Sequence, residues 1–344
     1  MFKRRELSSW LKLGLMLSAV AACLVGVVVL PWWASFVLVP IAAIATTTAA
    51  MLGHEGSHRS FSNSNVRNAL LTHLMFPLFS GLGAMYWRHK HNGLHHGHPN
   101  VLGQDPDIDI WPMASCRADY ESSGRLRRWF QRNLQGYLFW PLTTLMPTVM
   151  RIPSIKFVIA DLGKRGLTRA NAADALCLTA HYTLWLVVPS VVWGPLETIA
   201  LYMSLWCLVG VLLSLIFAPA HIGLPITSNQ FRDWLHQLET TRNLRVPAWL
   251  RYLFIGLDYQ VEHHLFPTIP HQNMARACVI VRAWCLELGL EHQEVGYRDA
   301  LVSVTSFIRD AWDYEAGSRE DLRRRTNASS RQARTRHPGP AGPG

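Results

Sequence analysis

Histidines are concentrated in one short stretch of the chain, and clustered imidazoles are how many proteins bind transition metals. Residues 87–100 read WRHKHNGLHHGHPN and contain five of the sixteen histidines, at positions 89, 91, 95, 96 and 98. Neutral imidazole is the commonest nitrogen ligand for such metals. The packing of a hydrophobic core does not require this density of histidine. The stretch therefore predicts a metal site.

Two smaller clusters, HEGSH at residues 54–58 and QVEHH at residues 260–264, lie far from this stretch in the sequence. A spacing of four residues puts two rings on one face of a helix, and it joins His54 to His58 and His91 to His95. Each cluster adjoins an apolar segment, so we expect all three at one depth. The candidate metal ligands from the three clusters are His54, His58, His91, His95, His96, His263 and His264.

Seven imidazoles are more than one zinc ion needs, because a catalytic zinc uses three protein ligands. They suit two metals of higher coordination number, and iron is the natural metal for activating oxygen with open coordination positions. Such a pair would differ from the carboxylate di-iron sites of helical bundles, which use Glu and Glu-x-x-His. We therefore expect two iron ions as the cofactor.

The elements that must position these clusters are predicted to be membrane helices. Apolar residues make up 49% of the chain, charged residues 16%, and there are fourteen tryptophans. No Lys or Arg occurs between Lys12 and Arg59 or between Arg169 and Arg232. Each gap has room for two crossings of about 20 residues. The alternative, two buried helical hairpins in a soluble core, is disfavoured because the apolar runs exceed typical core helices. The predicted crossings are residues 13–30, 33–51, 175–193 and 199–217.

The predicted fold is all-α, a polytopic membrane protein with two transmembrane hairpins and a cytoplasmic helical cap that holds the His-rich di-iron site. If both hairpin turns face outward, every Lys and Arg faces the cytoplasm, as the positive-inside rule expects. Both termini and the active site are then cytoplasmic. The first apolar run is interpreted as a retained helix rather than a cleaved signal peptide. The expected organisation is a basic N-terminus (residues 1–12), a membrane domain (13–317) and a disordered tail (318–344).

The segments between the hairpins carry weaker signals. Residues 69–87 are apolar but contain Pro77 and two glycines, which predicts an interfacial or re-entrant segment. An acidic loop follows at residues 103–112, and residues 115–170 mix basic and apolar runs like helices on a membrane surface.

The six cysteines lack CxxC spacing, so neither a disulfide framework nor a cysteine zinc site is indicated. The net charge of +10 is explained by basic cytoplasmic segments and their attraction to anionic lipid headgroups. Nothing in the sequence indicates binding to nucleic acid.

The histidine clusters and their surroundings resemble the membrane fatty acid desaturases. HEGSH, HNGLHH and QVEHH are similar to the three histidine boxes of that family, and LDYQVEHHLFPTIP at residues 257–270 resembles the context of its third box. Gln260, in place of His, is similar to the front-end branch. The sequence departs from the family at Glu55, where Asp is more usual. It also has three residues between His91 and His95, where front-end members commonly have two. The resemblance covers about residues 10–290.

The resemblance implies an eighth metal ligand, His221, just after the fourth predicted crossing. It implies an oxidoreductase that uses O2 and two electrons to place a cis double bond in an acyl chain carried by CoA, a carrier protein or a lipid. The sequence shows no His-Pro-Gly-Gly haem domain, so an external donor such as a ferredoxin or a cytochrome is expected. Membrane lipids are further expected partners. Candidate contacts for the donor, or for lipid phosphates, are Arg88, Lys90, Arg125, Arg127 and Arg128.

The remaining histidines are expected to have other roles. His89 and His98 are predicted to face away from the metals, and His73 and His181 to pack within apolar segments. We further hypothesise that Glu55 and Asn92 orient ligand imidazoles through their free N–H groups. Four histidines are expected at the surface, His236, His271, His292 and His337.

Three other functions fit parts of the sequence. HEGSH satisfies the H-E-x-x-H signature of zinc proteases, but an intramembrane protease would leave five histidines of the other clusters without a role. A related di-iron hydroxylase, ketolase or acetylenase would use the same boxes, although the context of the third box favours desaturation. A metal transporter is less favoured, because transporters place ionisable groups inside the bilayer.

Overall fold

The computed structural model describes residues 1–228 and 233–317 of the chain. Within them the protein is mostly helical with very little strand, as the sequence predicts. The expected disordered tail, residues 318–344, lies outside the described residues, and so does His337.

Four helical stretches in the described part of the chain are long and apolar enough to cross a membrane, which confirms the prediction of two hairpins. Three of them begin earlier than predicted, because a helix continues through polar residues wherever its backbone hydrogen bonds can form, and the second begins at Ala34, one residue later than predicted. Thr168 and Asn171, for instance, form a capping box that starts the third stretch before its apolar run. The first hairpin is α1 (Glu6–Val29), the short η1 (Ala34–Leu38) and α2 (Val39–Ser57). The second is α9 (Arg169–Tyr182), η4 (Thr183–Val187), α10 (Val188–Trp193) and α11 (Pro195–His221).

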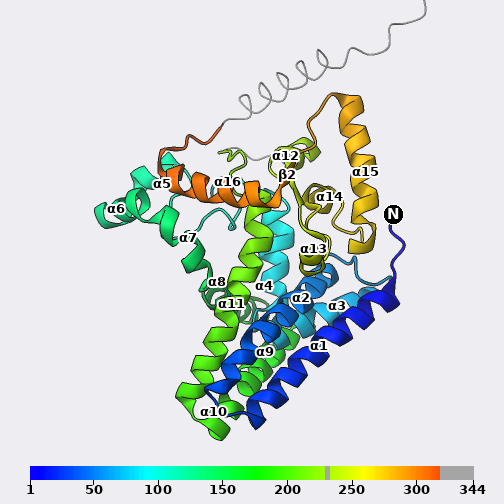
Figure 1. Cartoon of the computed structure of the whole chain (residues 1–344), viewed down its shortest axis with the longest axis vertical. Coiled ribbons are helices and arrows are strands. Elements are labelled where there is room, and N and C mark those ends of the chain that lie inside the picture. The colour runs from blue at the N-terminus through cyan, green and yellow to red at the C-terminus, as the bar shows by residue number, and fades with distance from the viewer. Residues whose placement is uncertain (229–232, 318–344) are drawn as a thin grey trace, which may run out of the picture.

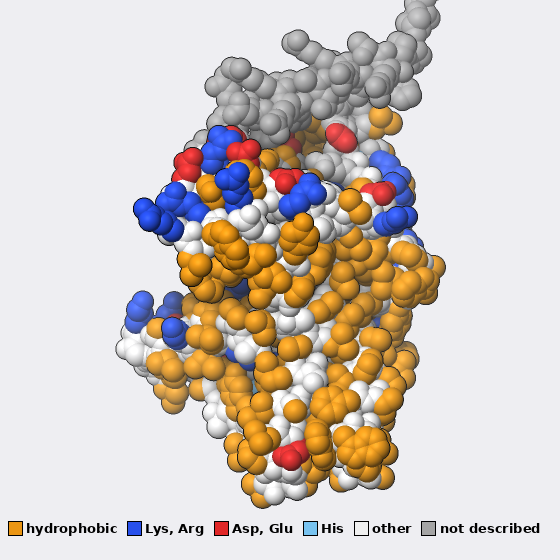
Figure 2. Space-filling view, turned by 60° about the vertical axis from the view of Figure 1, so that its left-hand side comes forward, with side chains coloured by type: hydrophobic (Ala, Val, Ile, Leu, Met, Phe, Trp, Pro, Cys, Tyr) orange, Lys and Arg blue, Asp and Glu red, His pale blue; other side chains and the backbone are white. Residues whose placement is uncertain are grey.

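The four long stretches lie together in the lower part of the molecule, and the shorter helices of the cap lie above them (Figure 1). Hydrophobic side chains cover most of the lower surface, whereas Lys, Arg, Asp and Glu gather mainly toward the cap (Figure 2). This division of surface types is the one expected for a protein whose lower part lies in a bilayer.

Two helix pairs are sharply bent. The first joins α3 and η2 to α4 and η3, with a bend of 110°. Gly81 is left-handed at the bend (φ +68°), and a Cβ there would lie 2.6 Å from His181 Nε2. This segment is therefore not a straight crossing, in agreement with the sequence. Its parts are α3 (Asn65–His73), η2 (Leu74–Ser80), α4 (Ala84–Trp87) and η3 (Arg88–His95).

The second bent pair, α7 and α8, turns by 70° and packs against α11. A Cβ at Gly210 of α11 would lie 2.5 Å from the carbonyl oxygen of Thr143, so only glycine permits this close approach. The contact fixes the position of α11 along α7, and α11 carries His221 as its last residue. The helices of this region are α5 (Arg117–Ser122), α6 (Arg125–Asn133), α7 (Gln135–Thr143) and α8 (Met146–Arg165).

The cap is tied to the long helices by the largest hydrophobic core cluster. Leu52 of α2, Leu71 of α3, Ile216 of α11 and Phe254 of the cap are all buried in it. In the described residues a short parallel strand pair, β1 (Asn243–Arg245) and β2 (Glu294–Gly296), joins the segments before and after the third histidine box. The cap helices are α12 (Trp234–Glu239), α13 (Ala248–Phe254), α14 (Gln260–Leu265), α15 (His271–Leu288), α16 (Tyr297–Asp310) and η5 (Ala311–Asp313).

Candidate metal centre

The structure brings all eight predicted ligands together, in two groups at the junction between the long helices and the cap. In each group the candidate ligand atoms lie within 4.8 Å of one another. The ligands come from the ends of α2, η3 and α11 and from α14, so four separate parts of the sequence meet here. The first group is His54, His58, His91, His96 and His263, and the second is His95, His221 and His264.

The π-helical hydrogen bonding of η3 distributes the second box between the two groups. The backbone N–H of His96 donates to the carbonyl of His91, five residues earlier, at 2.9 Å. His91 therefore shares the first group with His96, whereas His95 joins the second group. The spacing of four between His91 and His95 therefore does not put them in the same group. That spacing aligns two side chains in an α-helix, whereas η3 is a π-helix. His91 and His95 remain close, and with Asp107 they form a further overlapping set.

The first group presents several ring nitrogens that face one another. His91 Nε2 lies 2.7 Å from His54 Nε2 and 3.2 Å from His96 Nε2. Within the described residues, the Nε2 atoms of His58 and His263 are buried without a hydrogen-bond partner. Buried polar atoms are nearly always partnered, so unpartnered nitrogens aimed at one region fit a site that a metal completes.

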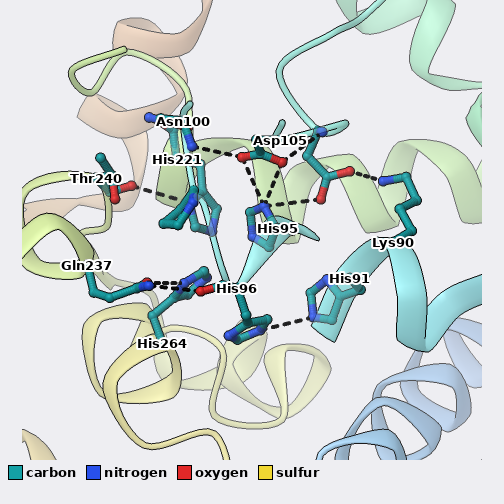
Figure 3. Close-up of polar contacts among 12 residues, drawn as sticks. Lys90, His91, His95, His96, Asn100, Asp105, His221, Gln237, Thr240 and His264 are labelled. Atoms are coloured by element: carbon teal, nitrogen blue, oxygen red, sulfur yellow. Dashed lines mark hydrogen bonds and ion pairs between the residues drawn. The ribbon is translucent and has the colours of Figure 1, made fainter. Parts of the chain in front are cut away.

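The second group shows how its imidazoles are oriented (Figure 3). His95 Nδ1 lies 3.1 Å from both oxygens of Asp105, and His264 Nδ1 lies 2.9 Å from Gln237 Oε1. His221 Nδ1 lies 3.3 Å from the carbonyl oxygen of Thr240. Each of these oxygens accepts, so each Nδ1 carries the proton and leaves the Nε2 lone pair for a metal. These three orienting contacts were missed by sequence analysis.

Asp105 is the most constrained of the orienting groups. Its side chain is buried, and its oxygens also accept the backbone N–H groups of Asn100 at 2.8 Å and Asp107 at 2.9 Å. The sequence signal was the acidic loop at residues 103–112, but the loop alone does not show which carboxylate faces a ligand. Gln260 also lies at this group, with its Nε2 atom 2.9 Å from His221 Nε2.

The hypothesis that Glu55 and Asn92 orient ligand imidazoles is wrong in its contacts. Glu55 accepts the backbone N–H of His271 and its Nδ1–H, both at 2.7 Å. Asn92 donates to the carbonyl oxygen of Ser57 at 2.9 Å. Both residues are next to a ligand in a helix and so point to a different face. Engaged with His271, Glu55 is not placed to activate water between two zinc ligands, which weighs against the protease alternative.

Several histidines outside the two groups differ from expectation. His236 is buried and its Nε2 lies 2.7 Å from the carbonyl oxygen of Pro99. The side chains of His271 and His292 are only 9% and 4% exposed, because each pairs with a buried carboxylate. The prediction of a surface position is therefore wrong for all three. His89 is exposed, as expected for a residue that faces away, whereas His98 is buried outside both groups.

The two histidines predicted to pack in apolar segments do so. His181 is buried and lies 2.9 Å from the Tyr202 hydroxyl through its Nε2 atom. His73 is largely buried beside Asp174, with 3.0 Å between its Nδ1 and the carboxylate.

Burial keeps the imidazoles of His96, His263 and His264 in the neutral form that binds metals. Burial, followed by repulsion from neighbouring imidazoles, lowers the pKa of His96, His263 and His264 well below 6.5. In the unfolded chain these groups recover an ordinary pKa. They therefore take up protons near pH 6 only when the chain unfolds.

We expect the metal-free protein to lose stability as the pH falls below 6.5. A histidine with a lowered pKa contributes stability above its unfolded pKa, and that contribution disappears on acidification. Each such group adds up to about 1.4 kcal/mol per pH unit to the slope. Thermal unfolding of the chelator-treated protein in detergent, between pH 7.5 and 5.5, measures it. His263→Asn should reduce the slope by up to about 1.4 kcal/mol per pH unit, because it removes one such group. An unchanged slope in that variant would contradict the assignment.

Comparison with known proteins agrees with this geometry. The chain matches the fatty acid desaturase family over residues 2–296. Fatty acid desaturase 3 of Bos taurus is 27% identical over 284 residues, which cover 81% of this chain and 62% of the relative. Fatty acid desaturase 3 of Homo sapiens is 25% identical over 288 residues, with coverage of 82% and 62%. A delta(8)-fatty-acid desaturase of Helianthus annuus is 25% identical over 311 residues, with coverage of 85% and 66%. The chain thus spans about six tenths of the length of the first two relatives.

Proposed function

The chain belongs to the fatty acid desaturase family, as its histidine boxes predicted, and from this premise we propose that it desaturates a fatty acyl chain. The proposed reaction removes two vicinal hydrogens from the acyl chain and leaves a cis double bond, while O2 takes up these hydrogens with two further electrons and two protons to give two waters. The observation that carries the proposal is the meeting of eight histidines in two groups beside four apolar helices.

We propose that each group holds one iron ion. The donor set fits, because all eight ligands are imidazoles and several Nε2 atoms are buried without a partner in the described residues. When bound, the irons supply the activated oxygen that an unactivated C–H bond requires and that no side chain offers. The five imidazoles of the first group and the three of the second would hold metals with different numbers of open positions.

The residues of this chain supply orientation and a dry environment. Asp105, Gln237 and Thr240 fix the tautomers of the second group, so its rings need no change of tautomer when a metal binds. Burial of both groups excludes water from the reacting carbon. The centre adjoins the ends of α2 and α11, so we propose that the acyl chain reaches it from between the apolar helices.

The proposed topology places the termini and the centre on the cytoplasmic side. Its support is the absence of Lys and Arg between Lys12 and Arg59 and between Arg169 and Arg232, together with four stretches that are apolar enough to cross a membrane. We propose that residues 1–12 form a basic cytoplasmic N-terminal segment and that residues 13–317 form the membrane desaturase domain. An external ferredoxin or cytochrome is the proposed electron donor. The acyl carrier is proposed to be CoA, a carrier protein or a lipid.

Expression in a host with a simple lipid profile tests the proposal. Mass spectrometry of the fatty acids is expected to show a new unsaturated acyl species with the wild-type protein. The His95→Ala variant should produce none, because it removes the imidazole that Asp105 orients. His89→Ala, at an exposed position outside both groups, should retain the product. Unchanged acyl chains together with an oxygenated lipid would instead support a hydroxylase or ketolase.

A further inference from the structure

Two of the histidine boxes contain a buried carboxylate beside a metal ligand. Glu55 follows His54 in the first box, and Glu262 precedes His263 in the third. Their residues are 6% and 0% exposed, respectively. A buried carboxylate is costly unless it is paired, so its partner shows what the fold requires of it.

Glu55 is engaged entirely at the start of α15. Its two oxygens accept the backbone N–H and the Nδ1–H of His271, each at 2.7 Å. The other ring nitrogen of His271 lies 3.1 Å from Lys12 Nζ on α1. The last turn of α2, which carries His54 and His58, is therefore held to the first residue of α15.

Glu262 is engaged further along α15, where the candidate ligand atoms of Glu262, His292 and Cys278 of that helix lie within 4.8 Å of one another. Its Oε1 lies 2.8 Å from His292 Nε2, and its Oε2 accepts from Asn243 Nδ2 at 2.7 Å. Asn243 Oδ1 also accepts the backbone N–H of Val261 at 2.9 Å. Asn243 therefore binds both the backbone and a side chain of the first turn of α14. The pairing of β1 with β2 places Asn243 opposite Glu294 and keeps His292 in reach.

The two histidines hold their carboxylates at two points along α15. His271 is the first residue of the helix, and His292, four residues after its end at Leu288, lies back beside Cys278. From His271 to Cys278 the helix rises by about 10 Å. Figure 1 shows α15 at the edge of the cap beside α14. We propose that His271, α15 and His292 form a clamp, termed the α15 clamp, which fixes the first and third histidine boxes relative to each other.

His271 and His292 are positioning residues in this proposal, since they act on the ligands through Glu55 and Glu262. The proposal rests on the metal centre of the proposed function. A rival reading is a separate metal site, because Glu262, Cys278 and His292 also lie within 4.8 Å of one another. Both Glu262 oxygens already accept hydrogen bonds, which favours the clamp.

The full-length protein in nanodiscs tests the clamp by hydrogen–deuterium exchange, which does not depend on metal. In His292→Ala, amides of residues 260–265 should exchange about tenfold faster, as expected for loss of a charge-assisted hydrogen bond. Amides of residues 54–58 should exchange about threefold faster, because α15 is then held at only one of its two contact points. His271→Ala should show the reverse pattern. Acceleration confined to the box next to each substitution would overturn the clamp, and so would no acceleration.

Two further measurements, on a conservative variant and on the rate of metal release, distinguish a positioning role from a general loss of structure. His292→Gln retains an N–H donor and should restore slow exchange, and the exposed His89→Ala should match the wild type. Iron should leave both alanine variants for a chelator about tenfold faster than it leaves the wild type. A third metal per chain that is lost in His292→Ala would overturn the clamp in favour of the rival site. A wild type without iron would refute the proposed function, while the exchange measurement still decides the clamp.

Discussion

Replacing Asp105 with asparagine is expected to weaken metal binding at the second group by about 10- to 100-fold. The two carboxylate oxygens of Asp105 accept from His95 Nδ1 and from two backbone N–H groups. An asparagine has one oxygen and one amide donor, so either orientation turns an N–H group toward another donor. His95 would then favour the tautomer in which Nε2 carries the proton. A protonated Nε2 has no lone pair to offer to a metal.

The measurement for Asp105→Asn is the metal retained per chain as a chelator is added. Asp109→Asn is the matched control, because Asp109 belongs to the same acidic loop but is exposed. The control should bind metal like the wild type. Wild-type affinity in Asp105→Asn would show that the contact does not orient a ligand, and the tautomer argument would then fail.

Replacing His221 with alanine is expected to remove one of two metals. The second group has three imidazoles, and loss of one leaves only His95 and His264. The first group keeps all five of its imidazoles and should keep its metal. Metal content should fall from about two ions per chain to about one, with loss of the unsaturated product.

A matched control for His221→Ala is His181→Ala. His181 is also buried in a candidate membrane stretch, but it belongs to neither group. This variant should retain both metals if loss of a buried histidine alone is harmless to the centre. Two retained metals in a folded His221→Ala protein would exclude His221 as a ligand.

The parts of the fold that sequence analysis predicted are those encoded by local patterns. The absence of Lys and Arg from two long windows gave the hairpins, and the density of histidine gave seven of the eight grouped residues. His221 stands alone in its segment, so only the resemblance to a family pointed to it. The structure places it in the second group with His95 and His264.

The parts that could not be predicted depend on contacts between distant segments. Gln237 meets His264 across 27 residues, and Glu55 meets His271 across 216 residues. Nothing local distinguishes His271 or His292 from a surface histidine, because the carboxylate that buries each one lies elsewhere in the sequence. The π-helical form of η3 was also unpredictable from the spacing, and it decides which group His95 joins.

The metal content of the purified wild-type protein tests the central claim most directly. Elemental analysis by mass spectrometry, after expression in medium that contains both iron and zinc, should find about two irons per chain and no stoichiometric zinc. One zinc per chain, or a folded protein that holds no metal, would contradict a histidine-ligated di-iron centre.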